Sequence, residues 1–207
     1  MSFQFPLFCT CIFSECLPSR CGRAVNDGLI EESEAHQLLN LAKKGLAKGG
    51  SNGGASIIDL HSGALSSGPQ FVNVYKTYPD LFKAGDFDVY QKVKAKIKAY
   101  IADHFEIEAN SLYLTHPTFF SRLEAKEAKT IHDEYWHIHI DKETYPTFHY
   151  TSLLYLTDFG VDFNGGEFVF VDNHEKLNRY IKLYTLYNYY CLFPIHFLTI
   201  LGPLNHV

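Results

Sequence analysis

The residues with the clearest potential for chemistry are His139 and Asp141, which are separated by one isoleucine. In a β-strand, side chains two residues apart point to the same face, so we expect the imidazole and the carboxylate to face one pocket. Two such ligands and a distal histidine form the ligand set of many non-haem Fe(II) sites, which leaves positions open for substrate and O2. A chain with 11 histidines contains such a pair easily by chance, so the interpretation depends on the surrounding sequence.

The sequence after this pair is typical of two strands joined by a turn. Residues 150–156, YTSLLYL, are rich in aromatic and β-branched side chains, as strands are. Asn164-Gly165-Gly166 predicts a turn, and residues 167–171 alternate with the period of a strand. A strand, a turn and a second strand after a pair of metal ligands are expected where a double-stranded β-helix builds its metal-binding face.

Other side chains that bind metals crowd this part of the chain, and the residues alone leave the ligand set open. A cupin-type metalloprotein would use His137, His139 and another ligand without any keto acid. The candidates within residues 132–149 are His132, Asp133, Glu134, His137, His139, Asp141 and His149.

Several long segments carry a resemblance to a known family. They are CGRAVNDGLIEESEAHQLLNLAKKGL, GGSNGGASIIDLHSGALS, LTHPTFFSRL, HDEYWHIHIDK and YTSLLYLTDF, and they cover about residues 21–172. With these segments the chain resembles the 2-oxoglutarate- and Fe(II)-dependent oxygenases of the prolyl 4-hydroxylase type. The resemblance implies an α+β fold, in which a double-stranded β-helix (jelly roll) is supported by N-terminal helices.

The resemblance also implies roles for particular residues. His139 and Asp141 fill the His-x-Asp positions of the family, so they are expected to bind iron, with His137 as a pocket residue that orients the ligands. Tyr155 lies where related oxygenases place a tyrosine that contacts the distal carboxylate of 2-oxoglutarate, although a core aromatic residue is the alternative interpretation. Gly165 and Gly166 match a family Gly-Gly pair and are expected to form a turn.

The implied activity is hydroxylation of a protein or peptide substrate, with release of succinate and CO2. The cofactor and cosubstrate are then Fe(II) and 2-oxoglutarate, and L-ascorbate is expected to keep the iron reduced. The family relationship further implies membrane association or a location in the lumen of the secretory pathway. Residues 3–13 are apolar but too short to span a bilayer, so we expect this chain to begin downstream of the membrane anchor.

Two amphipathic helices are predicted to support the sheet. The first covers residues 27–46, with Ser33 as its cap, and the second covers residues 86–106, with lysines on a solvated face. Residues 49–54 predict a flexible glycine-rich loop. We expect residues 55–85 to be irregular, with one short strand at 71–75, and residues 112–123 to form a strand that is irregular or at an edge because of Pro117.

The tail after residue 172 departs from the family pattern. His196 lies 55 residues after Asp141, near the spacing of a distal iron ligand, but no Arg or Lys follows Lys182. A dicarboxylate cosubstrate would then lack its charge-assisted anchor. Three interpretations compete: a replaced C-terminus that leaves the β-helix incomplete with exposed sheet edges, a membrane anchor in residues 183–201, or a divergent strand pair in which His196 binds iron. A catalytically inactive chain with a partial iron site, acting in binding or regulation, is the rival function.

Length alone indicates one domain with short appendages, and the resemblance divides the chain into three parts. They are an N-terminal segment of residues 1–20, an oxygenase domain of residues 21–172 and an apolar tail of residues 173–207. The net charge of −5, without a stripe of basic residues, weighs against a nucleic-acid partner. The spacing of the four N-terminal cysteines favours disulfides or free thiols over a zinc knuckle. These cysteines are Cys9, Cys11, Cys16 and Cys21.

Overall fold

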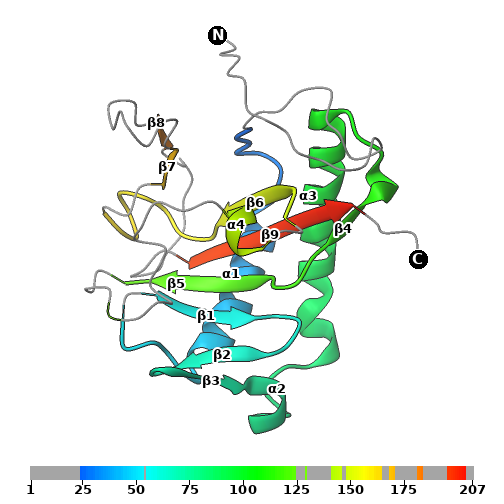
Figure 1. Cartoon of the computed structure of the whole chain (residues 1–207). Coiled ribbons are helices and arrows are strands. Elements are labelled where there is room, and N and C mark those ends of the chain that lie inside the picture. Colours follow the sequence, from blue (N-terminus) through cyan, green and yellow to red (C-terminus); the bar gives the residue numbers. More distant parts are fainter. Residues whose placement is uncertain are drawn as a thin grey trace.

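The computed structural model describes residues 24–53, 55–124, 129, 141–145 and 148–164, together with the backbone of three later strands at 168–170, 181–183 and 195–203. His139 and the other candidate ligands between residues 130 and 140 lie outside the described residues, as do the four N-terminal cysteines. In Figure 1 the described part consists of helices packed on an antiparallel sheet. The predicted α+β class is therefore confirmed.

Helix α1 spans Glu32–Leu46, so the chain enters it five residues later than the sequence pattern predicts. Its cap is also different from the predicted Ser33. Glu31 is the N-cap, and the Glu34 side chain accepts a hydrogen bond from the Glu31 backbone N–H at 2.9 Å in a capping box. The predicted apolar face is confirmed, because its leucines and Ala42 are buried.

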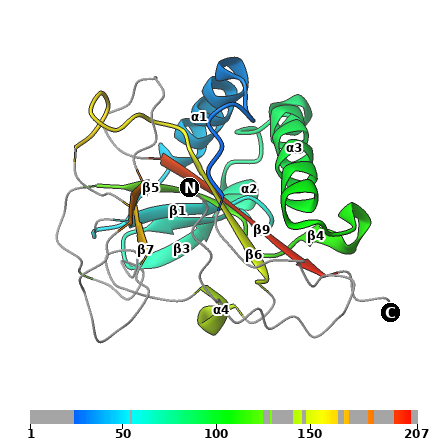
Figure 2. The same ribbon diagram turned by 90° about the horizontal axis from the view of Figure 1, so that it is seen from above.

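Helix α3 spans Asp88–Phe105 and follows the 3-10 helix η2, Ala84–Phe87. Its periodic apolar side chains, among them Tyr90, Val93 and Ile97, are buried as predicted. Glu106 ends the helix in the left-handed conformation with a φ of 56°, and the short helix η3, Ala109–Ser111, leads into the sheet. Figure 2 shows α1 and α3 on one face of the sheet, and the short helix α4, Asp141–Thr144, on the opposite face.

Residues 55–85 are more regular than predicted. They form three consecutive antiparallel strands, β1 at Ala55–Asp59, β2 at Ala64–Ser67 and β3 at Gln70–Asn73, followed by helix α2 at Val74–Thr77. The strands contain serine and alanine, which have weak intrinsic strand preference, so the pairing partners decide their structure. Gly63 and Gly68, with φ of 72° and 58°, make the tight turns between them.

The strand predicted over residues 112–123 is interrupted where Pro117 lies. Strand β4 spans Leu112–Leu114 and β5 spans Phe119–Leu123, and the His116-Pro117 peptide bond between them is cis. The predicted irregularity is confirmed, but β5 is no edge strand, because it pairs with β1 on one side and β9 on the other.

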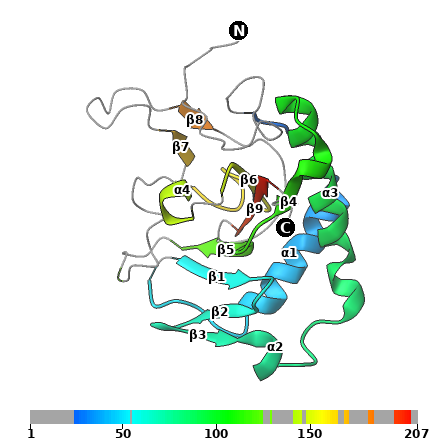
Figure 3. The same cartoon turned by 45° about the vertical axis from the view of Figure 1, so that its right-hand side comes forward.

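The tail contributes the longest strand of the sheet, β9, which spans Ile195–Pro203. It pairs antiparallel with β4 and β5 on one side and with β6, Tyr150–Tyr155, on the other. Figure 3 shows β9 between these strands. The tail thus enters the seven-stranded sheet, with the order β3-β2-β1-β5-β9-β4 and β6 beside β9. The exposed sheet edge that a replaced C-terminus would leave beside β5 is not observed.

Two further strands form a separate antiparallel pair, β7 at Phe168–Phe170 and β8 at Ile181–Leu183. Strand β7 confirms the strand predicted over residues 167–171. Within the described residues, no helix is long and apolar enough to cross a membrane.

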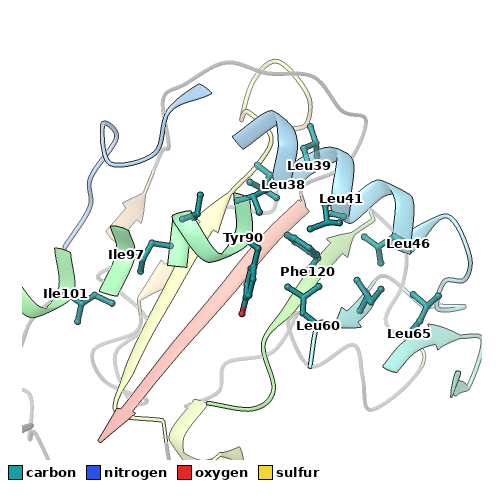
Figure 4. Close-up of a cluster of buried hydrophobic side chains, with 14 of the residues drawn as sticks. Leu38, Leu39, Leu41, Leu46, Leu60, Leu65, Tyr90, Ile97, Ile101 and Phe120 are labelled. Carbon is teal, nitrogen blue, oxygen red and sulfur yellow. The ribbon is translucent and has the colours of Figure 1, made fainter. Parts of the chain in front are cut away.

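The main hydrophobic core fills the space between the two long helices and the sheet (Figure 4). Leu38 and Leu46 from α1, Val93 and Ile97 from α3, and Phe120 from β5 belong to it. Burial of these side chains is the main force that holds the helices on this face. It leaves the opposite face of the sheet for α4 and the residues around it.

A buried carboxylate links the two helices. Glu34 on α1 is 2% exposed and contacts Lys92 and Lys96 on α3 at 2.9 and 2.7 Å between side-chain oxygen and nitrogen. These two lysines are therefore more than the solvated face that the sequence predicts. Burial alone would raise the pKa of Glu34, but hydrogen bonds from Lys96, Lys92 and the Glu31 backbone lower this pKa to about 2.

The lowered pKa of Glu34 predicts acid-sensitive stability. The unfolded carboxyl has a pKa of about 4.3, so the stabilising contribution is complete above about pH 5 and is lost as the pH falls toward 2. We expect Glu34→Gln to lower the free energy of unfolding at pH 7 by about 2 kcal/mol, and the deficit to shrink by pH 3. Urea denaturation at both pH values measures this difference. Glu32→Gln, an exposed change in the same helical turn, is the control, and an equal deficit at both pH values would contradict the prediction.

Candidate metal centre

The candidate metal centre lies on the sheet face opposite α1 and α3. Phe119 on β5 and Phe148 form a small buried cluster there, against which Ile57 on β1 and Leu153 on β6 pack. Their sequence neighbours Ile58, Phe120 and Leu154 belong to the main core on the helix side. Because strand side chains alternate, Thr151 and Tyr155 on β6 lie on the same face as Leu153.

Asp141 is the first residue of helix α4. Asp141 therefore lies in a helical turn and not in the predicted strand. His139 lies outside the described residues, so the predicted pairing of the two side chains stays a prediction. The Asp141 carbonyl accepts a hydrogen bond from the Tyr145 N–H at 2.8 Å, which closes the single helical turn. The Tyr145 ring stacks on Phe148 of the small aromatic cluster at 4.5 Å between centroids. This packing places α4 on the sheet.

Thr151 fixes the carboxylate of Asp141. Its Oγ1 donates a hydrogen bond to Asp141 Oδ2 at 3.1 Å. Metal-binding carboxylates are typically held by such a hydrogen bond, which orients them toward the ion. No motif marks Thr151 in the sequence, and the only signal for its role is its place in the predicted strand over residues 150–156.

Tyr155 is the last residue of β6 and is partly buried on this same face. Burial raises the pKa of its phenol, so the hydroxyl keeps its proton at neutral pH. A protonated phenol donates a hydrogen bond to a carboxylate oxygen, which is the chemistry predicted for this residue.

The backbone of His196 lies in β9, directly opposite Tyr155 on one side and Ser121 on the other. The predicted third ligand, His196, and the predicted cosubstrate residue, Tyr155, are therefore direct cross-strand partners in the sheet. Thr151, which binds Asp141, pairs instead with Ile200. Four residues separate these two positions, or about 13 Å along the strands. Asp141 and His196 are therefore associated with different ends of β6.

The described residues supply only part of an iron ligand set. Among them there is no group of three or more His, Cys, Asp or Glu side chains that could hold a metal ion. Asp141 supplies an oriented carboxylate, which fits the carboxylate position of a non-haem iron site. The predicted imidazole partner, His139, lies outside the described residues.

Another carboxylate near the end of β6 has an unusual environment. Asp158 is buried, and burial together with the nearby charge of Asp162 raises its pKa to about 6. Asp162 Oδ2 accepts a hydrogen bond from the Asp158 N–H at 2.8 Å, so the two acidic residues belong to one closed turn. The sequence carries no signal for this pair, since two aspartates four residues apart in a loop form no specific motif.

Comparison with known proteins gives close relatives. The chain is 55% identical over 174 residues to a Xenopus tropicalis protein named 2-oxoglutarate and iron-dependent oxygenase domain-containing protein 3, and this match covers 82% of the chain and 54% of the relative. The Homo sapiens protein of the same name is 52% identical over the same number of residues. The chain therefore spans about half the length of the curated relatives it matches. No family model matches the chain, and no solved structure matches it.

Identity above 50% over 174 residues cannot arise by chance. The matched part of this chain is therefore homologous to these proteins, all of which are named 2-oxoglutarate and iron-dependent oxygenase domain-containing protein 3.

Proposed function

We propose that this chain forms the catalytic part of an Fe(II)- and 2-oxoglutarate-dependent dioxygenase of the prolyl 4-hydroxylase type, built on a double-stranded β-helix. The proposed reaction hydroxylates a protein or peptide substrate and releases succinate and CO2. The observation that carries the proposal is the carboxylate of Asp141, held by Thr151 on a sheet face that also presents Tyr155. The names of the homologues support iron and 2-oxoglutarate as the cofactor and cosubstrate.

In this proposal Asp141 and His139 bind the iron, with His196 as the candidate third ligand. Bound iron would supply the activation of O2 that protein side chains cannot carry out. Thr151 orients the Asp141 carboxylate, and the protonated phenol of Tyr155 donates a hydrogen bond to the distal carboxylate of 2-oxoglutarate. The aromatic cluster of Phe119 and Phe148 keeps water away from one side of this face. L-ascorbate as reductant, and a membrane-associated or secretory location, belong to the same proposal.

The experiment that tests this function is an anaerobic titration of the purified chain with Fe(II) and 2-oxoglutarate. A ternary complex gives a weak visible charge-transfer band, and we expect this band to form at stoichiometric iron. Mn(II) in place of Fe(II) is the control, because it occupies such a site without producing the band. A folded chain that gives no band would favour the rival function, a partial iron site that serves in binding or regulation. That rival is supported by the absence of Arg or Lys after Lys182.

The register of β9 predicts a graded effect of removing His196. We expect His196→Ala to weaken Fe(II) binding less than Asp141→Ala does, because His196 lies opposite Tyr155 and Asp141 is bound to Thr151, four residues along β6. Fe(II) titration of both variants beside His139→Ala measures the order. Equal losses in all three variants would identify His196 as a full ligand and contradict the separation that the register indicates.

A further inference from the structure

Two histidines outside the proposed iron site have their rings in contact. His61 lies in the turn between β1 and β2, and His116 lies in the segment between β4 and β5. Their ring centroids are 3.8 Å apart and the ring planes are tilted by 59°. Both residues are exposed to solvent. Two imidazoles from distant parts of the chain therefore share one open position on the surface.

A single buried carboxylate fixes the backbone of both segments. Asp59 Oδ1 accepts hydrogen bonds from the N–H of His61 at 3.2 Å and from the N–H of Thr118 at 3.1 Å. Asp59 Oδ2 accepts from the N–H and the hydroxyl of Ser62. The Leu60 N–H also donates to the Thr118 carbonyl at 2.8 Å, which joins the two segments directly. The backbone of the two segments that carry the histidines is therefore held together before any ligand arrives, which lowers the entropic cost of binding.

The two imidazole side chains suit a metal ion. Neutral imidazole is the form that binds late first-row transition metals. Asp59 already accepts four hydrogen bonds, so it acts as the support and not as a ligand.

We propose that His61 and His116 form a two-histidine site for a late first-row divalent ion of the zinc type, with water in the remaining coordination positions. Zinc–nitrogen distances of about 2.0–2.1 Å place two ligand nitrogens roughly 3 Å apart. The ring centroids, now 3.8 Å apart, would have to move apart by roughly 1 Å for one nitrogen of each ring to face the same ion, so both exposed side chains would rotate on binding. A bound ion would connect the β1–β2 turn to the segment before β5. Because it binds only the folded state, it would raise the free energy of unfolding.

The test follows the ring protons of individual histidines by NMR while Zn²⁺ is added to the full chain. We expect the His61 and His116 signals to shift together with one midpoint. In His116→Gln the His61 signal is expected to need at least tenfold more zinc, and the reverse holds for His61→Gln. This readout is local, so zinc bound to other histidines of the chain does not obscure it.

His104→Gln is the matched control, because the His104 ring stacks on Tyr100 instead of another imidazole. It is expected to leave the shared midpoint of His61 and His116 unchanged. Separate midpoints for the two histidines, or a midpoint for either one that the loss of the other does not change, would overturn the proposal. The site is independent of the proposed iron chemistry, so failure of one leaves the other standing.

Discussion

Replacing Asp141 with alanine is expected to remove Fe(II)-dependent turnover of 2-oxoglutarate almost completely. Loss of an outer residue that merely orients a metal ligand typically costs 10–100-fold in affinity or activity, so loss of a ligand itself is expected to exceed about 100-fold. The structure supports this role because Thr151 holds the Asp141 carboxylate at 3.1 Å on the face that also presents Tyr155. Succinate release measures turnover, and anaerobic Fe(II) titration measures binding.

Two variants separate the loss of a ligand from a disturbance of α4. Glu143→Ala changes an exposed carboxylate in the same helix and is expected to keep full iron affinity. Thr151→Val removes the hydrogen bond to Asp141 without removing the carboxylate, so an intermediate loss of about 10-fold is expected. If Asp141→Ala binds Fe(II) as tightly as Glu143→Ala does, Asp141 is no iron ligand and the proposed site is wrong.

The elements that the sequence predicts well are those with a strong local pattern. The apolar stripes of α1 and α3 repeat with the helical period, and their buried faces are confirmed down to residues such as Leu38 and Val93. Strand β6 is confirmed for the same reason, because YTSLLY carries strong strand preference. In these segments the local sequence preference is sufficient to predict the secondary structure, because the packing of the folded chain favours the same helix or strand.

The elements that the sequence predicts poorly depend on partners far along the chain. Strands β1 and β2 contain serine and alanine, and only their pairing and the turn glycines make them regular. The helical turn that begins at Asp141 likewise leads into Tyr145, which packs on the aromatic cluster, a contact that the local sequence does not specify. The role of Thr151 could not be predicted, because its contact with Asp141 joins residues whose proximity only the fold creates.

The tail shows the same dependence on long-range partners. Its sequence departs from the family pattern, yet β9 pairs along both sides and connects β5 to β6. A central strand is stabilised by packing of its apolar side chains against those of the strands on both sides, and this does not require a family motif in its sequence. The register of β9 then sets which residues share a face, and it places His196 beside Tyr155. The pairing register of β9 with β6 therefore decides which residues of the tail lie near the proposed site.

The largest expected effect on stability comes from Phe120. This side chain is 1% exposed and belongs to the main core under α1 (Figure 4). Its strand β5 lies between β1 and β9, where Ile58 and Phe197 are its cross-strand partners, so the sheet has little freedom to close a cavity there. We expect Phe120→Ala to lower the free energy of unfolding by about 3–5 kcal/mol, and the melting temperature by roughly 10 °C.

Denaturant unfolding with a metal chelator present measures this effect apart from any contribution of bound ions. Phe71→Ala is the matched control, because Phe71 is 41% exposed on the edge strand β3 and its loss is expected to cost less than about 1 kcal/mol. Phe120→Leu keeps most of the volume and should cost below about 1.5 kcal/mol. The loss in free energy of unfolding is therefore expected to be largest for Phe120→Ala, smaller for Phe120→Leu and smallest for Phe71→Ala, because the cavity left in the core decreases in that order. Equal destabilisation by the two alanine variants would mean that β5 does not lie in the centre of the core, and the face assigned to Asp141 and Tyr155 would then have to be assigned again.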